Sequence, residues 1–450
     1  MNAPHLIYLA WGFPPAAKSC TYRMLATANS FVRAGWDVTV ITLSEQAWVR
    51  EHGLDLSLVD LVDPRIEIVR LPLFRDDLDT DIRSYSRMRA QRPREWLKWH
   101  RRRDQVDFPE PVFGRWRKPV TDALFAAHDR KPADLVLTSA SPYTFFAPAL
   151  ALHQKEGVPF VLDYRDAWAI DILNDVPAFT PTSRKGRIER DLMDSLTEAW
   201  FVNSPIRDAY AALYPEQADR MRVVRNGSDV AVGTDRIPLR GPDVEHGLTF
   251  GYLGTITFNP ARTRAICEAW VEARSRDPLL ARSRLEIRGH TGAGAARGTN
   301  AHARVIHEYA EHGVLLDGPV AKGDTAAVYS SWDVLVLCLV GGRYVTSGKV
   351  YDYVSTGLPV MSVHERDHAA AEILGDYPLW VPNASLEVHD IADAFVRSAE
   401  MAVQATPEQR EAARAYATRY ERYAQIQPAV DRLSARFGAI ARQTPEEARP

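Results

Sequence analysis

Three stretches near the start of the chain decide the fold class: HLIYLAW at His5–Trp11, MLATANSFV at Met24–Val32 and DVTVITL at Asp37–Leu43. The first and third stretches are short apolar runs of strand length. In the stretch between them, apolar residues recur at helical spacing, and Gly35 follows where that helix would end. A strand, a helix and a second strand in this order predict a β-α-β unit with parallel strands.

The same alternation of apolar runs and amphipathic segments continues through most of the chain, which predicts an α/β fold on parallel sheets. Further strands are predicted in the first half at Ile66–Arg70, Asp134–Thr138, Pro159–Asp163, Ala199–Asn203 and Arg222–Val224. Strands are predicted in the second half at Leu248–Leu253, Leu285–Arg288, Val314–Leu316, Asp333–Leu339, Pro359–Val363 and Leu379–Val381. Helices are predicted between the later strands around Arg262–Arg276, Ala301–Glu311, Asp324–Ser330, Lys349–Ser355 and Glu387–Val403.

The segment RIPLRGPDVEHG at residues 236–247 has prolines, glycines and charges without apolar periodicity, so we interpret it as a linker. It separates a first Rossmann-like domain at 1–235 from a second one at 248–405, and we expect their sheets to face each other across a cleft. A helical segment is expected at 406–440, followed by a frayed tail at 441–450.

Composition excludes several classes of protein. The 450 residues include 55 Lys or Arg and 58 Asp or Glu, a formal net charge of −3 without the basic excess of a dedicated nucleic-acid binder. The cysteines Cys20, Cys267 and Cys338 lie far apart without a CxxC pair, which excludes a disulfide framework and the usual zinc spacings. The start lacks a standard secretion signal, and no apolar run approaches the ~20 residues of a membrane span. We therefore expect a cytoplasmic protein with no nucleic-acid partner.

The loop AWGFPPAAKSCTYR at Ala10–Arg23 follows the first strand and precedes its helix. Parallel sheets bind ligands at such turns, and its small residues would let an anion approach the helix N-terminus. The loop lacks the GxGxxG pattern of dinucleotide-binding proteins. The alternative is a plain connecting loop.

A second stretch, VPFVLDYRDAW at Val158–Trp168, places two aspartates and an arginine at the end of a predicted strand. Asp163, Arg165 and Asp166 are suited to hydrogen-bonding sugar hydroxyls and to holding one another in place. The alternative is an ion-pair cluster that braces the loop.

A third stretch, TSGKVYDYVSTGLPV at Thr346–Val360, has a small-residue turn that opens a helix, and then a glycine and a proline that return the chain to a strand. Backbone N–H groups of the turn, the helix dipole and the Lys349 ammonium together suit a nucleotide diphosphate. The alternative is an exposed pair of Lys349 and Asp352.

These stretches resemble retaining GT-B glycosyltransferases of family 4. Phe13-Pro14-Pro15 and Arg23 are similar to the opening of that family, residues 163–168 to its D-x-R-D-x-W strand end, and residues 346–360 to its S-x-K-x-x-E-Y-x-x-x-G-x-P-V pattern. The chain departs from the family where Tyr344 replaces a glutamate and Gly254 replaces an arginine.

The resemblance implies transfer of a sugar from a nucleotide-diphosphate sugar to an acceptor hydroxyl with retention, in the synthesis of cell-surface polysaccharides, glycolipids or specialised glycosides. It implies no metal and no cofactor, because cations and helix dipoles hold the diphosphate. The acceptor side is expected at Lys18, Ser19, Arg23 and Asp163, and catalytic groups at Arg165, Asp166 and Lys349. The donor site is expected at Gly254, Thr255, Arg288, Ser347, Gly348, Lys349 and Asp352, with Arg262 and Arg264 as approximate substitutes for a lysine of the family.

A basic insertion at residues 83–118 holds twelve Lys or Arg and four acids, a local net charge of +8, with interleaved aromatic residues. This composition suits an anionic membrane surface, which would make the protein peripheral on the inner face of the membrane and fits a lipid-linked acceptor. It also suits single-stranded nucleic acid. The alternative is a solvated helical insertion whose aromatic residues pack inward.

Two other functions stay open for this sequence. A nucleotide-sugar 2-epimerase of the same fold would bring several acidic groups and histidines together at the sugar. A non-catalytic GT-B-like binding protein would bind a nucleotide or its partner without chemistry.

Overall fold

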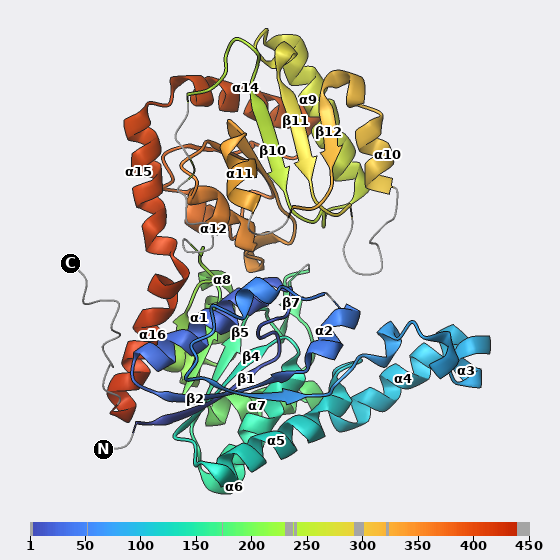
Figure 1. Ribbon diagram of the computed structural model, residues 1–450, viewed down its shortest axis with the longest axis vertical. Coiled ribbons are helices and arrows are strands. Elements are labelled where there is room, and N and C mark those ends of the chain that lie inside the picture. The colour runs from blue at the N-terminus through green and yellow to red at the C-terminus, as the bar shows by residue number, and fades with distance from the viewer. Residues whose placement is uncertain are drawn as a thin grey trace. The chain divides into compact units, whose positions relative to one another are not determined.

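The computed structural model describes residues 3–51, 53–172, 174–229, 237, 241–291, 301–320 and 324–438 (Figure 1). The chain forms two compact units, one built from the residues up to Asn226 together with those from Arg422 onward, and one from Gly227–Glu421. The boundary at Asn226 precedes the linker expected at 236–247, of which Ile237 and 241–247 are described. The tail expected at 441–450 lies outside the described residues.

The first unit contains a seven-stranded parallel sheet in the order β3-β2-β1-β4-β5-β8-β9. Its strands are β1 (His5–Ala10), β2 (Asp37–Leu43), β3 (Glu67–Leu71), β4 (Leu135–Ala140), β5 (Phe160–Tyr164), β8 (Glu198–Phe201) and β9 (Met221–Val223). Its helices are α1 (Ser19–Arg33), α2 (Glu45–Glu51), α3 (Arg87–Gln91), α4 (Pro93–Asp107), α5 (Arg117–Arg130), α6 (Phe146–Glu156), α7 (Arg184–Ser195), α8 (Ser204–Leu213) and α16 (Arg422–Phe437). Each strand expected in this half is present, with small shifts at its ends.

The β-α-β unit predicted at the start of the chain is confirmed. Helix α1 buries Met24 and Phe31, which lie two turns apart on one face, and the chain leaves the helix at Gly35 with a φ of 91°. Glycine adopts this left-handed conformation without the strain that a side chain would cause. The chain then enters β2, which pairs in parallel with β1.

Helix α16 follows the second unit in sequence but packs within the first. Its Ser434 hydroxyl accepts a hydrogen bond from the Trp36 indole N–H at 2.9 Å, and Phe437 meets the Trp36 ring edge to face at 5.5 Å. Arg432 forms an ion pair with Glu198 at 2.8 Å. The segment from Arg422 onward therefore completes the core of the first unit.

The second unit contains a six-stranded parallel sheet in the order β12-β11-β10-β13-β14-β15. Its strands are β10 (Thr249–Leu253), β11 (Arg284–Arg288), β12 (Val314–Asp317), β13 (Val334–Cys338), β14 (Val360–Val363) and β15 (Trp380–Val381). Its helices are α9 (Pro260–Arg276), α10 (Ala301–His307), α11 (Thr325–Ser330), α12 (Gly348–Val354), α13 (Ala371–Leu374), α14 (Val388–Gln404) and α15 (Pro407–Ala417). The strands and helices expected here are confirmed.

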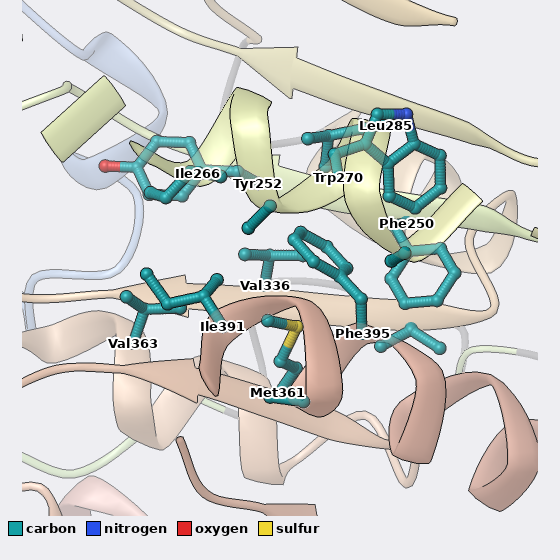
Figure 2. Packing of buried hydrophobic residues seen from close by; sticks show 14 of the residues in the cluster. Phe250, Tyr252, Ile266, Trp270, Leu285, Val336, Met361, Val363, Ile391 and Phe395 are labelled. Atoms are coloured by element: carbon teal, nitrogen blue, oxygen red, sulfur yellow. The ribbon is translucent and has the colours of Figure 1, made fainter. Parts of the chain in front are cut away.

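Two apolar clusters cover the two faces of this sheet. Figure 2 shows the first, where Phe250 of β10, Trp270 of α9 and Phe395 of α14 pack with ring centroids 5.2–5.5 Å apart. The second cluster lies under α11, α12, α13 and α15. Val336 of β13 belongs to the first cluster and Leu335 to the second, as expected for a strand whose alternate side chains are buried on opposite faces.

Both sheets reverse their strand order beside their first strand, between β1 and β4 in the first unit and between β10 and β13 in the second. Open parallel sheets bind ligands outside the carboxyl ends of their strands at such a reversal. A ligand-binding site is therefore expected at the loops after these four strands.

The basic insertion forms α3, α4 and the segment that leads into α5. In Figure 1, α4 extends away from the sheet of its own unit and carries α3 at its outer end. Trp96, Phe108 and Trp116 are buried, while Trp99 is 49% exposed. Most aromatic residues of the insertion thus pack inward. In the ranges that the structure covers, no helix has the length and apolar character that crossing a membrane requires.

A short antiparallel hairpin, β6 (Ile170–Asp171) with β7 (Val176–Pro177), follows the strand-end motif at 163–168 and was not predicted. Its strands have two residues each, too few to show an alternating pattern.

Candidate functional site

Lys349 lies at the reversal point of the second sheet. Its Nζ donates to the Tyr252 hydroxyl at 2.5 Å and to the Thr255 carbonyl at 3.3 Å. The Tyr252 hydroxyl in turn donates to the Thr255 carbonyl at 2.8 Å. The ammonium group is thereby fixed at the carboxyl end of β10, where the sequence predicted a diphosphate.

The charge of Lys349 has no acidic partner in the described part of the chain. Its Nζ lies 4.2 Å from the centre of the Tyr252 ring, and burial lowers the pKa of Lys349 to about 8. A desolvated cation without a counter-charge destabilises the folded state, and a bound anion would offset this destabilisation. Lys349 therefore suits an anion.

Gly254 makes room for this lysine. A Cβ atom at position 254 would lie 2.5 Å from Cε of Lys349, and φ there is 126°, which disfavours any other residue. The resembled family carries an arginine at this position. In this chain the position is a glycine, and the side chain of Lys349 occupies the space beside it. Gly254 positions the cation, and Thr255 contributes its carbonyl.

Arg262 of α9 comes to the same edge. The charges of Arg262, Lys349 and Glu365 all act on the Cys338 thiol, the last residue of β13, whose pKa is raised by burial. The Arg262 Nη2 atom lies 3.9 Å from Oε1 of Glu365, and its Nη1 is buried without a hydrogen-bond partner. Arg264 instead forms an ion pair with Glu308 at 2.7 Å.

The remaining donor-side candidates have other surroundings than the Lys349 side chain. Arg288 pairs with Asp317 at 3.1 Å and with Glu286 at 3.4 Å, so its charge is already compensated. Ser347 caps α12 by accepting the backbone N–H of Lys349 at 3.3 Å, and the exposed Gly348 begins that helix. Burial and then the charge of Asp352 raise the pKa of Tyr329, which places Asp352 beside that ring.

In the first unit, Arg23 and Asp163 form a fully buried pair. Arg23 donates from Nη2 and Nε to the two carboxylate oxygens at 2.6 and 2.9 Å, and from Nη1 to the Val224 carbonyl at 2.9 Å. The Ser139 hydroxyl donates to the same carboxylate at 2.7 Å. The pair connects α1, β4, β5 and the segment after β9, which is a bracing arrangement.

Lys18 and Arg165 both lie at the carboxyl ends of the first sheet, near enough for the charge of Arg165 to act on Lys18. The Nζ of Lys18 lies 4.0 Å from the centre of the Trp11 ring. Burial lowers the pKa of Lys18, Cys20 and Glu51 oppose this shift, and Arg165 and Arg75 add to it. Arg165 Nη1 is buried without a hydrogen-bond partner.

The other two first-unit candidates are open to solvent. Asp166 follows Arg165 and is exposed, and so is Ser19, the first residue of α1. The structure thus places Lys18 and Arg165 at the same end of the sheet, and it leaves the hydroxyl of Ser19 and the carboxylate of Asp166 at the surface of this unit.

An aromatic stack supports the strand-end motif. Trp168 stacks on Phe108 with ring centroids 5.5 Å apart and on Tyr143 at 5.2 Å. Phe108 belongs to the basic insertion, so the insertion is packed against the segment that carries Arg165 and Asp166. The sequence did not indicate this contact.

Sequence reasoning also missed His364, Glu365 and His368, which follow β14 at the same edge as Lys349. Each has a buried polar atom without a hydrogen-bond partner. The only signal was a polar run, HERDH, directly after a buried strand. Across the described ranges, no three His, Cys, Asp or Glu side chains are arranged to hold a metal ion.

Two Rossmann-like units of this kind define the GT-B fold class, and solved structures agree. Sucrose-phosphate synthase from Thermosynechococcus elongatus is similar with a TM-score of 0.60 and 15% identity, covering 97% of this chain and 99% of that one. Anabaena HepE, solved in complex with UDP-glucose, is similar with a TM-score of 0.57 and 12% identity over 96% and 99% of the two chains.

A putative UDP-N-acetylglucosamine 2-epimerase from Listeria monocytogenes is similar with a TM-score of 0.57 and 10% identity over 98% and 100% of the two chains. Residues 20–227 match the family model of the glycosyl transferase 4-like domain. No curated protein matches this chain. The fold and the class of the first domain thus agree with the resemblance drawn from the sequence.

Proposed function

We propose that this chain is a glycosyltransferase that moves a sugar from a nucleotide-diphosphate sugar to an acceptor hydroxyl with retention. The observation that carries the proposal is the Lys349 ammonium, fixed by Tyr252 and Thr255 at the reversal point of the second sheet without an acidic partner among the described residues. The glycosyl transferase 4-like match over residues 20–227 supports the same class.

In this proposal the donor diphosphate lies against Lys349. The bond between C1 of the sugar and the phosphate oxygen breaks, and the acceptor oxygen bonds to C1. The acceptor proton passes to the departing phosphate, so no protein base is required. Lys349 offsets the negative charge that grows on the phosphate, and such an interaction stabilises the transition state by about 2–4 kcal/mol.

The acceptor is proposed to bind the first unit. Lys18 and Arg165 offer two neighbouring cations, and the exposed Asp166 and Ser19 offer hydrogen-bonding groups. Arg23 and Asp163 act there by positioning the elements around them, because their own polar groups face each other. The proposed reaction uses no metal and no cofactor.

The acceptor class that we propose is a sugar, a small molecule or a lipid-linked carrier. The basic insertion favours a carrier at an anionic membrane surface. Arg101, Arg102 and Arg103 of α4 are exposed together with Trp99 and Val106, whose exposed fractions are 49% and 70%. Basic side chains beside exposed apolar ones are typical of surfaces that lie at a bilayer interface.

The test begins with thermal shift and calorimetry against UDP-, GDP-, ADP- and dTDP-sugars and the corresponding nucleoside diphosphates. Binding of one pair is expected, because a ligand that binds only the folded state stabilises it. The anomeric configuration of the transfer product, read by NMR, then decides retention. The absence of any nucleotide binding would contradict the proposal.

A second candidate function is nucleotide-sugar 2-epimerisation. The gathering of His364, Glu365 and His368 beside Lys349 favours it, as does the likeness to the Listeria protein. Incubation of the best-binding nucleotide sugar without acceptor, followed by NMR of the sugar protons in D2O, separates the two functions. Epimerisation at C2 would appear as deuterium incorporation and a second sugar product.

A further inference from the structure

The loop after β14 holds its backbone rigidly. The N–H of His364 donates to Oδ1 of Asn383 at 3.3 Å, and Nδ2 of Asn383 donates back to the His364 carbonyl at 3.1 Å. The N–H of His368 donates to the Glu365 carbonyl at 3.0 Å. The side chains of this loop therefore project from a fixed frame at the carboxyl end of the sheet.

Both histidine rings are buried and each uses its Nδ1 atom locally. Nδ1 of His364 lies 2.8 Å from the Glu365 carbonyl and donates to it, which leaves Nε2 of the neutral ring as an acceptor. Nδ1 of His368 accepts the Ala370 N–H at 3.0 Å, which leaves an N–H donor at Nε2. The two ring centroids are 5.0 Å apart.

The rings are neutral at physiological pH. Burial lowers the pKa of His364. Burial, and after it the neighbouring His364 ring, lowers the pKa of His368 to about 4, while the Val340 carbonyl acts in the opposite direction. The two free ring nitrogens therefore keep fixed and opposite hydrogen-bonding roles.

Four buried polar atoms at this place have no hydrogen-bond partner: His364 Nε2, His368 Nε2, Glu365 Oε2 and Arg262 Nη1. Buried polar groups in folded proteins are almost always hydrogen-bonded, so four exceptions in one neighbourhood require an explanation. The charges of Glu365, Arg262 and Lys349 all act on the Cys338 thiol, so Glu365 and Arg262 lie near the proposed donor site. His364 and His368 belong to the same loop as Glu365.

The four atoms form a mixed set of two donors and two acceptors. A free phosphate or carboxylate accepts hydrogen bonds but donates few, and the Glu365 carboxylate would repel it. A sugar hydroxyl donates one hydrogen bond and accepts others, so neighbouring hydroxyls match the set.

We propose that Arg262, His364, Glu365 and His368 recognise the hydroxyl groups of the donor sugar. This assignment rests on the proposed function, since it requires a nucleotide sugar whose diphosphate lies at Lys349. It makes the loop after β14 the part of the chain that selects one sugar among those carried by the same nucleotide.

The test compares the nucleotide sugar with its own nucleoside diphosphate. Calorimetry measures both ligands, taken as the best-binding pair of the UDP, GDP, ADP and dTDP panel, on the unmodified protein and on Glu365→Gln. Loss of a hydrogen bond to a charged group is expected to weaken the nucleotide sugar about 10- to 100-fold. The nucleoside diphosphate, which has no sugar hydroxyls at this place, is expected to bind as before.

Asp367→Asn is the matched control, because it makes the same chemical change on an exposed side chain of the same loop. His364→Gln, which removes the ring acceptor, gives a second variant with the same expected selectivity should Glu365→Gln not fold, as judged by its melting curve. Equal weakening of both ligands, or of neither, would overturn the assignment while leaving the proposed function intact. Failure of the unmodified protein to bind any pair overturns the proposed function, and the assignment with it.

Discussion

The Lys349 ammonium and the Tyr252 hydroxyl meet at 2.5 Å, although their positions are 97 residues apart in sequence. The contact joins the start of α12 to the end of β10, so the lysine is held before any ligand arrives. A group fixed in advance stabilises a developing charge without the cost of reorganising it during the reaction.

Replacement of this lysine separates its chemical role from its structural cost. Lys349→Met is expected to lower turnover by roughly 30- to 1000-fold, because the departing phosphate loses a charged partner. Burial places the pKa of Lys349 at about 8, below the usual 10.5, so its charge destabilises the folded state at pH 7. The variant is therefore expected to melt at the same temperature or higher. Steady-state kinetics measures the turnover of the variant, and a melting curve measures its stability. The control is Lys155→Met, which replaces an exposed lysine that pairs with Glu156. Unchanged kinetics would remove Lys349 from the site.

The same pKa predicts how activity depends on pH. In the free enzyme, Lys349 loses its proton as the pH rises through about 8, and with it the charge that binds the diphosphate. The kcat/KM for the donor is expected to fall along an alkaline limb near that pH. A profile flat to pH 9.5 would argue against a role for this ammonium.

Gly254 offers a test that leaves the lysine itself in place. In Gly254→Ala, the new Cβ would lie 2.5 Å from Cε of Lys349 and the backbone would keep an unfavourable φ of 126°. We expect the lysine to be displaced and turnover to fall, with a loss of stability of roughly 1 kcal/mol from the backbone. Gly241→Ala, where a Cβ meets open space, is the comparison. Wild-type turnover of Gly254→Ala would contradict the packing argument.

The buried pair in the first unit is expected to affect stability more than chemistry. Asp163→Asn leaves the Arg23 guanidinium buried without its counter-charge, which costs about 3–5 kcal/mol. Urea unfolding measures this loss. Asp122→Asn removes one partner of the exposed pair with Lys118 and is expected to change stability little. A loss of turnover in Asp163→Asn at full stability would instead place Asp163 in the chemistry.

A buried acid in the first unit predicts a pH-dependent stability. Burial raises the pKa of Glu189 to about 8, and Tyr164 donates to its Oε1 atom at 3.1 Å. Because the unfolded carboxyl titrates near 4.5, the folded state binds more protons between about pH 4.5 and 8, and stability falls as the pH rises across that window. Glu189→Gln is expected to flatten this slope in a series of melting curves. An unchanged slope would assign the dependence to another group.

The basic insertion has its own test. Replacement of Arg101, Arg102 and Arg103 by glutamine is expected to abolish co-sedimentation with vesicles of anionic lipid. Binding by the unmodified protein is expected to weaken with salt, since the Debye length falls from about 10 Å at 0.1 M to about 3 Å at 1 M. Turnover on a small acceptor is expected to survive. If the unmodified protein ignores such vesicles at low salt, the insertion is a solvated arm.

The sequence predicted the architecture because apolar spacing alone distinguishes strands from helices over most of this chain. It also led to Lys349, since a turn, a helix start and a returning Gly-Pro stand in one continuous stretch. It did not lead to Tyr252, the side chain that holds that lysine. Tyr252 lies 97 residues earlier in the chain, on β10, and only the parallel order of β10, β13 and β14 brings it to the edge where Lys349 lies.

Arg23 and Asp163 were predicted to contact a ligand, but they bind each other instead. Each stands in a motif that suggests contact with a ligand, yet they are 140 residues apart and satisfy each other in the interior. Spacing along a chain cannot reveal that two polar groups share a hydrogen bond across a sheet. The histidines after β14 were missed for a related reason. Whether a buried polar atom has a hydrogen-bond partner can be judged only from the three-dimensional structure.

The position of α16 in the first unit has a consequence for biosynthesis. The ribosome makes most of the first unit first, but the indole of Trp36 cannot acquire its partners Ser434 and Phe437 until residues 422–437 have emerged. The residues of Gly227–Glu421, by contrast, are contiguous and can fold while synthesis continues. Part of the apolar surface of the nascent first unit therefore stays uncovered while nearly two hundred further codons are translated.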